Sequence, residues 1–277
     1  GGNFRLSTAM RARMPPPWLS WRTTVNPFRP ERLRAIAVAA LLVLPGLAFA
    51  AGNSKPSPHV VEIRDRWAEV TYNTPKPQRV AALESLASRS ESLRKAQPKD
   101  ANALIWDGIV LSSLAGERGG LGALGLVKQA RANFEAALAI DPTALDGAAY
   151  TSLGALYYQV PGWPVGFGDD KKARQLLRKG IEVNPDGLDA NFFYADFLRD
   201  QGDWKGAAAA LQKALAAPAR PGREVADRGR RQDRRHLASA FAGRQTAADH
   251  PGFKQFLEQH LCRSAQGNED PLPASSL

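Results

Sequence analysis

The chain has 277 residues, of which 44% are hydrophobic and 23% charged, so it is long enough to bury a substantial core. Its single cysteine excludes an intramolecular disulfide framework and a four-thiolate zinc site. The formal charge of +10 would suit a protein that binds nucleic acid or a membrane surface, if the basic residues belonged to a folded domain.

Most of that charge lies in the first fifty residues, where seven arginines and one glutamate contribute +6. A basic stretch at 29–34 precedes an apolar run at 35–44 and the small residues Ala48 and Ala50. This order predicts an N-terminal extension and signal peptide over 1–50, cleaved after Ala50. An uncleaved anchor is the alternative, although the run is shorter than the roughly 20 apolar residues that span a bilayer. We therefore expect a periplasmic or secreted protein with no nucleic-acid partner. The apolar run is not followed by a cysteine that could carry a lipid anchor, so whether the protein associates with a membrane stays open.

The rest of the chain predicts an all-α protein. Residues 51–97 are expected to form a degenerate helix pair, with helices at 60–71 and 78–96 bounded by prolines. Residues 98–219 hold three further pairs, 220–262 are predicted as capping helices, and 263–277 as a disordered tail.

The three central pairs share a pattern of small and bulky residues. Each second helix has a small residue, a bulky residue four positions later and a small residue three positions after that: Ala130, Phe134 and Ala137; Ala173, Leu177 and Gly180; Ala207, Leu211 and Ala214. Each first helix has one matching small residue, at Gly108, Gly154 or Ala195. Small residues let paired helices approach closely, and the bulky one fills the space between them. The pattern is typical of tetratricopeptide (TPR) repeats, and it predicts a TPR-like helix-pair solenoid.

Two of the pairs are longer than a 34-residue repeat. The interval between the first and second small residue is 12 positions in the third pair, as in an unbroken repeat, but 22 and 19 positions in the first two. We therefore predict Gly-rich insertions at 116–125 and 160–170, both in the turn between the paired helices. Trp163 and Phe167 lie in the second insertion, and aromatic side chains exposed there would anchor a partner.

The second insertion continues as Gly168-Asp169-Asp170-Lys171-Lys172-Ala173 into a TPR-type second helix. With the signal peptide, this segment resembles the T-component family of tripartite ATP-independent periplasmic (TRAP) transporters, over roughly residues 67–235. The resemblance implies a non-catalytic periplasmic scaffold that docks a substrate-binding protein or another partner, with self-association as a further option. Members that are anchored to the membrane carry a lipid-modified cysteine that this sequence lacks.

Three other patterns have simpler interpretations. The G-x-G-x-x-G match at 120–125 lacks the preceding strand of a dinucleotide site, so no cofactor is expected. The arginine-rich segment 220–235 is interpreted as a solvated capping helix with the pairs Asp227–Arg231 and Arg230–Asp233, against the alternative of an anion-binding patch. His236, His250, His260 and Cys262 are too widely spaced to predict a metal site.

The register also predicts a concave face, lined by one side of each first helix. The candidate groove residues are Ile105, Ile109, Thr151, Tyr158, Phe192, Asp196 and Arg199, with Asn102, Ser112, Ala155, Gln159 and Asp189 beside them. This lining is mostly apolar, which favours an extended peptide, an amphipathic helix or a small apolar ligand. The sequence leaves three functions open: a T-component-like scaffold, a carrier of a small apolar ligand in this groove, and an interaction module for assembly of the cell envelope.

Overall fold

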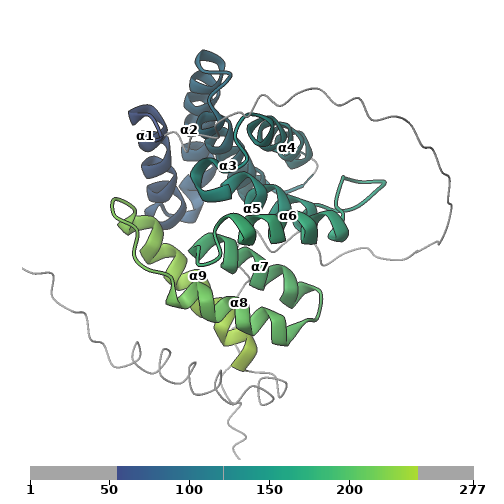
Figure 1. Ribbon diagram of the computed structural model, residues 1–277. Helices are drawn as coiled ribbons and strands as arrows, with labels where there is room; N and C mark the ends of the chain where they lie inside the picture. Colours follow the sequence, from purple (N-terminus) through teal and green to yellow (C-terminus); the bar gives the residue numbers. More distant parts are fainter. Residues whose placement is uncertain (1–54, 121, 243–277) are drawn as a thin grey trace, which may run out of the picture.

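The computed structural model describes residues 55–120 and 122–242, and its regular elements there are all helical (Figure 1). Within α9 the side chains of 235, 236 and 239–242 are not described. The elements are α1 (Pro58–Ala68), the π-helix η2 (Glu69–Asn73), α2 (Lys76–Ala96), α3 (Ala101–Arg118), α4 (Gly122–Ile140), α5 (Ala144–Gln159), α6 (Asp170–Val183), α7 (Leu188–Asp200), α8 (Trp204–Ala216) and α9 (Glu224–Ala242). None of these described helices is both long and apolar enough to cross a membrane.

Aspartates define where three of the helices begin. The side chain of Asp100 accepts a hydrogen bond from the backbone N–H of Asn102 at 2.8 Å, at the start of α3. Asp169 does the same at the start of α6, and Asp203 at the start of α8. Each carboxylate satisfies backbone donors that have no partner within the helix and interacts favourably with the positive end of the helix dipole. Local sequence therefore fixes where α3, α6 and α8 begin.

The helices pair as the small and bulky residues predict, α3 with α4, α5 with α6, and α7 with α8. All twelve positions of the pattern are buried. At the first pair a Cβ on Gly108 would lie 2.6 Å from the ring of Phe134, and at the second a Cβ on Gly154 would lie 2.8 Å from Cγ of Leu177. The backbones approach this closely only because those positions are glycine. The prediction of a TPR-like helical solenoid is confirmed.

The first Gly-rich insertion is not the loop that the sequence predicts. α3 continues to Arg118 and α4 already begins at Gly122, so only a short turn separates the two helices. Gly119 and Gly120 have φ of 63° and 64°, the left-handed region that glycine adopts without strain. The extra residues therefore lengthen the helices of the first pair, because Leu124 and Val127 add to their apolar packing.

The N-terminal pair contains a π-helix that sequence periodicity did not reveal. The backbone N–H of Thr74 donates to the carbonyl of Glu69 at 3.0 Å, which widens the end of α1 over five residues. Trp67 lies between Tyr72 and Trp106, with ring centroids 5.9 and 5.7 Å away. The N-terminal pair is thus joined to α3 through edge-to-face aromatic contacts.

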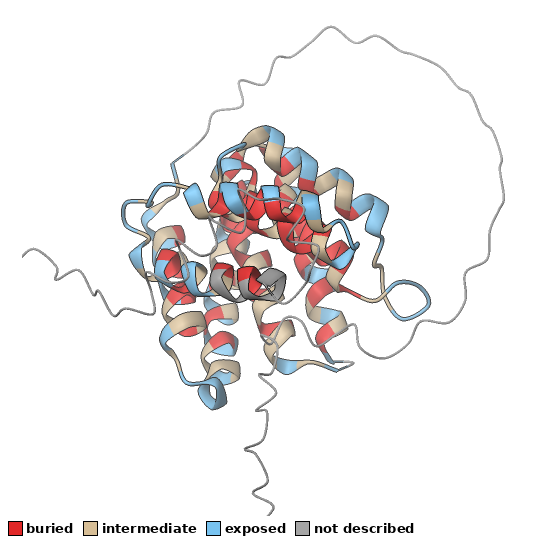
Figure 2. Cartoon of the chain, turned by 90° about the horizontal axis from the view of Figure 1, so that it is seen from below, coloured by how far each residue is buried: buried red, intermediate tan, exposed pale blue. Residues whose placement is uncertain are grey.

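α9 corrects the prediction of a solvated capping helix. It packs on α8 and also on α1 and η2, so it joins the two ends of the solenoid. Figure 2 shows it near the centre of the view, with the other helices around it. Ala226 belongs to the apolar cluster of α1 to α3, and Leu237 belongs to that of α3 to α8. α9 therefore contributes to both parts of the core.

Candidate functional site

The predicted groove residues are mostly inside the protein. Those that lie buried are Ile105, Thr151, Tyr158, Phe192 and Asp196, together with their neighbours Asn102 and Ala155. Ile109, Ser112, Gln159, Asp189 and Arg199 are partly exposed. The expectation of an open, mostly apolar groove is therefore wrong for the buried set. Tyr158 and Asp196 bond to each other between α5 and α7, and the guanidinium of Arg230 on α9 lies over the Phe192 ring.

Three of these residues form a polar cluster between α5 and α7. The hydroxyl of Tyr158 donates to Asp196 at 2.7 Å, and Arg199 pairs with the same carboxylate at 2.6 Å. Burial, reinforced by the negative charge of Asp196, raises the pKa of Tyr158 well above its usual value. The cluster satisfies buried polar groups and connects the second and third pairs, which is a structural role.

The far end of the predicted face carries an ionic network with α9. Asp189 accepts from Arg220 at 2.6 Å and from Arg230 at 3.0 Å, and Arg220 also binds Asp227. Burial of Asp189 favours the protonated acid, but the charges of Arg230 and Arg220 outweigh it and hold the pKa of Asp189 well below its usual range.

The interpretation of these arginines needs correction in two respects. The predicted pair Arg230–Asp233 is present at 3.1 Å, but Asp227 is buried against Arg220 and Arg231 is exposed. Arg234 is buried, and burial lowers its pKa to about 10. This face of α9 is thus engaged with the protein rather than with solvent.

The second insertion forms a true loop between α5 and α6, closed at its base. The backbone N–H of Gly168 donates to the carbonyl of Pro161 at 2.9 Å, and that of Asp169 donates to the carbonyl of Tyr157 at 2.8 Å. A Cβ at Gly168 would lie 2.0 Å from the carbonyl oxygen of Val160, so the two sides of the loop meet only because a glycine stands there. The peptide bond between Trp163 and Pro164 is cis.

The structure places the two predicted anchors of this loop differently. The Phe167 ring turns inward and packs edge-on against Tyr157 with centroids 5.4 Å apart, while the guanidinium of Arg131 lies 5.1 Å from the Phe167 ring centroid. Trp163 is 91% exposed and Val165 is 52% exposed. Phe167 therefore fixes the loop to the body of the protein, and Trp163 stands free at its tip.

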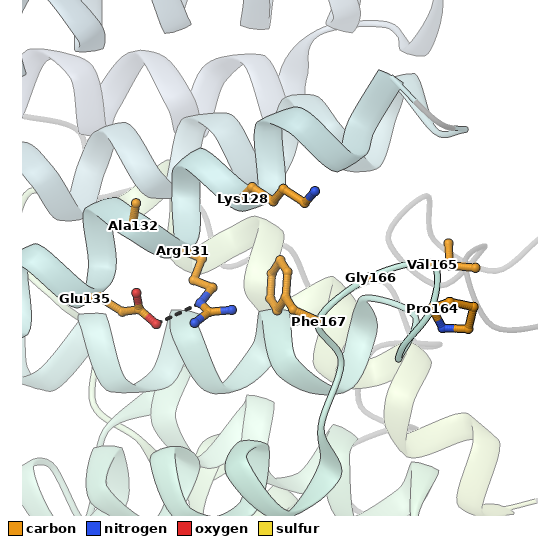
Figure 3. Close-up of a pocket in the computed structure, with 8 residues that line it drawn as sticks. All are labelled: Lys128, Arg131, Ala132, Glu135, Pro164, Val165, Gly166 and Phe167. Atoms are coloured by element: carbon orange, nitrogen blue, oxygen red, sulfur yellow. Dashed lines mark hydrogen bonds and ion pairs between the residues drawn. The ribbon is translucent and has the colours of Figure 1, made fainter. Parts of the chain in front are cut away.

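Beside the loop lies a hollow of about 320 Å³, between α4 and residues 164–167 (Figure 3). Its lining residues are Lys128, Arg131, Ala132, Glu135, Pro164, Val165, Gly166 and Phe167. In Figure 3 the Arg131 side chain extends between Glu135, to which it is hydrogen-bonded at 2.8 Å, and the Phe167 ring. That bond to Glu135 raises the pKa of Arg131. The hollow thus has a fixed cationic and aromatic wall next to the exposed Trp163 and Val165.

The remaining candidates stay separate from this site. A helix, α3, precedes the G-x-G-x-x-G segment, so the strand that a dinucleotide site requires is not found there. Among the described residues no three His, Cys, Asp or Glu side chains gather as metal ligands. His250, His260 and Cys262 lie outside the described residues, as do 1–50 and 263–277.

Sequence reasoning missed the residues that receive α9. Tyr72 on η2 and Phe193 on α7 both contact it, since Tyr72 donates to Asp233 at 3.3 Å and Arg230 lies 5.2 Å from the Phe193 ring. A glycine within a predicted helix, Gly229, was the available signal, because it indicates close approach of another element.

Comparisons with known proteins identify no family for this chain. No protein-family profile matches it, and no curated protein does. Among solved structures it is similar to a thermophilic TPR protein of Thermus thermophilus, with 19% identity, 73% of this chain and 99% of that chain covered, and a TM-score of 0.44. The TPR-like fold described above rests on the helix pairs themselves.

Proposed function

We propose that this protein is a non-catalytic, periplasmic TPR-like scaffold that binds a protein partner through the loop between α5 and α6. The observation that carries the proposal is Trp163, a large aromatic side chain that is 91% exposed on a loop with a closed base. Exposed aromatic residues held in a fixed position are typical of the residues that dominate binding energy at interfaces. Phe167 and Arg131 hold the loop in place, so little ordering is needed when a partner binds.

The partner that we propose is the substrate-binding component of a TRAP-type transporter. The support comes from the sequence: the signal-peptide pattern over 1–50 and the resemblance of the second insertion and its following helix to T-component proteins. An envelope-assembly partner would use the same exposed tryptophan, so the identity of the captured protein decides between them. The carrier hypothesis receives no comparable support, since Tyr158 and Phe192 are buried.

Photocrosslinking in cells tests the proposal directly. A photoreactive amino acid replaces Trp163 at the loop tip, and in a matched control it replaces Ile140, another exposed large apolar residue, at the end of α4. We expect a discrete periplasmic protein to crosslink at position 163 and not at 140. A substrate-binding protein encoded beside a TRAP permease would support the transporter role, and an envelope-assembly factor would contradict it. Equal crosslinking at both positions would contradict the loop site itself.

A further inference from the structure

The hollow between α4 and residues 164–167 is walled by a guanidinium whose terminal nitrogens are not engaged by the described part of the chain. We propose that this hollow is a receptor for one carboxylate of the partner protein, on an acidic residue that stands next to an apolar residue in the partner's sequence. The inference rests on the function proposed above, since it states what the loop between α5 and α6 recognises beside its exposed tryptophan.

Arg131 supplies a fixed pair of donors. Its Nε donates to Glu135 at 2.8 Å, and its guanidinium lies 5.1 Å from the Phe167 ring centroid and 5.4 Å from that of Tyr157. Its two Nη nitrogens make no hydrogen bond within residues 55–120 and 122–242, and the side chain is 34% exposed. A guanidinium held in this way presents its Nη groups in a fixed plane, and such a pair of N–H donors matches the two oxygens of a carboxylate.

Lys128 gives the hollow an excess of positive charge. The lining contains two cations, Lys128 and Arg131, against the single carboxylate of Glu135, so one positive charge is left over. Lys128 is exposed and forms no ion pair with the described residues. It precedes Arg131 by three positions and therefore shares its face of α4, and in Figure 3 both side chains extend from α4 toward the loop. The excess charge is complementary to that of one carboxylate.

The wall of the hollow opposite α4 is apolar and continues to the tip of the loop. Pro164, Val165 and Phe167 belong to its lining, and Val165 is 52% exposed. Trp163 directly precedes this wall and is 91% exposed. An apolar side chain next to the acidic residue of a partner can pack here while the carboxylate binds Arg131. The hollow thus fits an acidic and an apolar neighbour rather than a run of acidic residues.

A protein supplies this carboxylate better than a free organic acid does. Most of the lining residues are exposed, so a carboxylate on the surface of a partner reaches Arg131 without entering the core of the solenoid. A small acid inside the volume of about 320 Å³ would leave the exposed Trp163 and Val165 in water. Contact with a protein surface removes those apolar side chains from water as well, which adds to the binding free energy.

Selection of displayed peptides on the full chain tests the proposal. Random short peptides are selected on the immobilised wild-type chain, after removal of those that bind a Trp163→Ala/Lys128→Gln chain. We expect the recovered peptides to carry an aspartate or glutamate next to an aromatic or aliphatic residue. Replacing that acid by its amide should weaken binding at least about tenfold in fluorescence polarisation, because charge-assisted hydrogen bonds are lost.

Variants of the chain identify the donors. Lys128→Gln should weaken binding of the recovered peptides at least about threefold, whereas Lys213→Gln, the same change at an exposed lysine of α8, should leave their affinity unchanged. Arg131→Lys keeps the charge but loses the planar donor pair, so it should also weaken binding about tenfold. Because Arg131 also holds the Phe167 ring, Lys128→Gln is the decisive variant, since Lys128 has no bond within the described residues that the change could remove.

The results separate this inference from the function on which it rests. Peptides that need Trp163 but bind equally well as acid or amide would overturn the carboxylate receptor and leave the loop site in place. Equal affinity for the Lys128→Gln and wild-type chains would also overturn the receptor. Binding that needs the carboxylate and Lys128 but is unchanged by Trp163→Ala would support the receptor and contradict the tryptophan anchor.

Two further measurements test the source of the carboxylate. Displacement of the peptides by micromolar propionate would make a free organic acid the ligand and contradict a protein source. A dimer of the wild-type chain in light scattering that Lys128→Gln dissociates would make a second copy of this chain the occupant and contradict a separate partner.

Discussion

Replacing Gly108 by alanine should destabilise the protein, although the same change elsewhere in a helix is stabilising. In the middle of α3 a Cβ at this position would lie 2.6 and 2.7 Å from two carbons of the Phe134 ring, whereas carbon atoms in contact normally stay about 3.5–4.0 Å apart. The ring or the helix must therefore move by about 1 Å. Overpacking of this kind costs about 1–3 kcal/mol, against a gain in helix propensity of about 1 kcal/mol. We expect the free energy of unfolding to fall, by up to about 2 kcal/mol.

Gly125 provides the matched control. It lies in α4, and a Cβ added there would have no atom within 4 Å, so alanine adds helix propensity without a clash. We expect Gly125→Ala to raise the free energy of unfolding by about 0.5–1 kcal/mol. Urea denaturation followed by circular dichroism measures both variants, and the two changes should have opposite signs.

A double-mutant cycle identifies the contact responsible. Phe134→Leu removes the ring, so Gly108→Ala should be much less harmful, or stabilising, when both changes are present. The coupling energy should be at least about 1 kcal/mol. If Gly108→Ala stabilises the protein as much as Gly125→Ala does, the close approach of α3 and α4 inferred from the small-residue pattern is wrong.

Four further predictions concern two buried or paired carboxylates, the loop between α5 and α6, and the N-terminus. Asp107→Ala should lower the free energy of unfolding in urea by about 3 kcal/mol, because the buried carboxylate accepts hydrogen bonds from three side chains of α2 and α4. Asp189 has a lowered pKa in the folded state, so its contribution to the free energy of unfolding is complete above its ordinary pKa of 3.8 and should be lost as the pH falls below that value. The midpoint of urea unfolding should therefore decline less between pH 5 and pH 2 for Asp189→Asn than for the wild type. Phe167→Ala should lower the melting temperature by several degrees, whereas Trp163→Ala should change the free energy of unfolding by less than about 0.5 kcal/mol. The mature N-terminus, read by mass spectrometry of the exported protein, should follow Ala50; an intact N-terminus in the periplasm would contradict the signal peptide.

The helix pairs were predictable because their contacts are encoded in local spacing. A small residue that packs against a bulky one, as Gly154 does against Leu177, gives a pattern that is recognisable even where overall sequence identity to other proteins is low. The same reasoning failed at the first insertion, which we predicted to be a loop because it is rich in glycine. Glycine content does not distinguish a loop from a helix whose apolar side chains pack against another helix. Val127 finds such a neighbour, and α4 therefore begins earlier than its glycines suggest.

The candidate surfaces were less predictable because they depend on contacts between distant parts of the chain. Phe167 and Trp163 lie four positions apart in one insertion, and their spacing does not say which of them packs against the body of the protein. Phe167 does so because Arg131, on α4, lies against its ring, whereas Trp163 is exposed. Tyr72 and Asp233 are 161 positions apart and meet only because α9 returns to the N-terminal pair. Periodicity carries no information about such a return.

The position of α9 changes how the charge of this protein is understood. The segment 220–235 has an excess of four positive charges, and in the sequence it has the appearance of a solvated basic patch. In the folded protein Arg220 and Arg230 face Asp189, so the acid on α7 selects which arginines turn inward. Arg228 and Arg231 remain exposed on the same helix. α9 thus has an inward face that binds its own protein, through Arg230, and an outward basic face with Arg228 and Arg231.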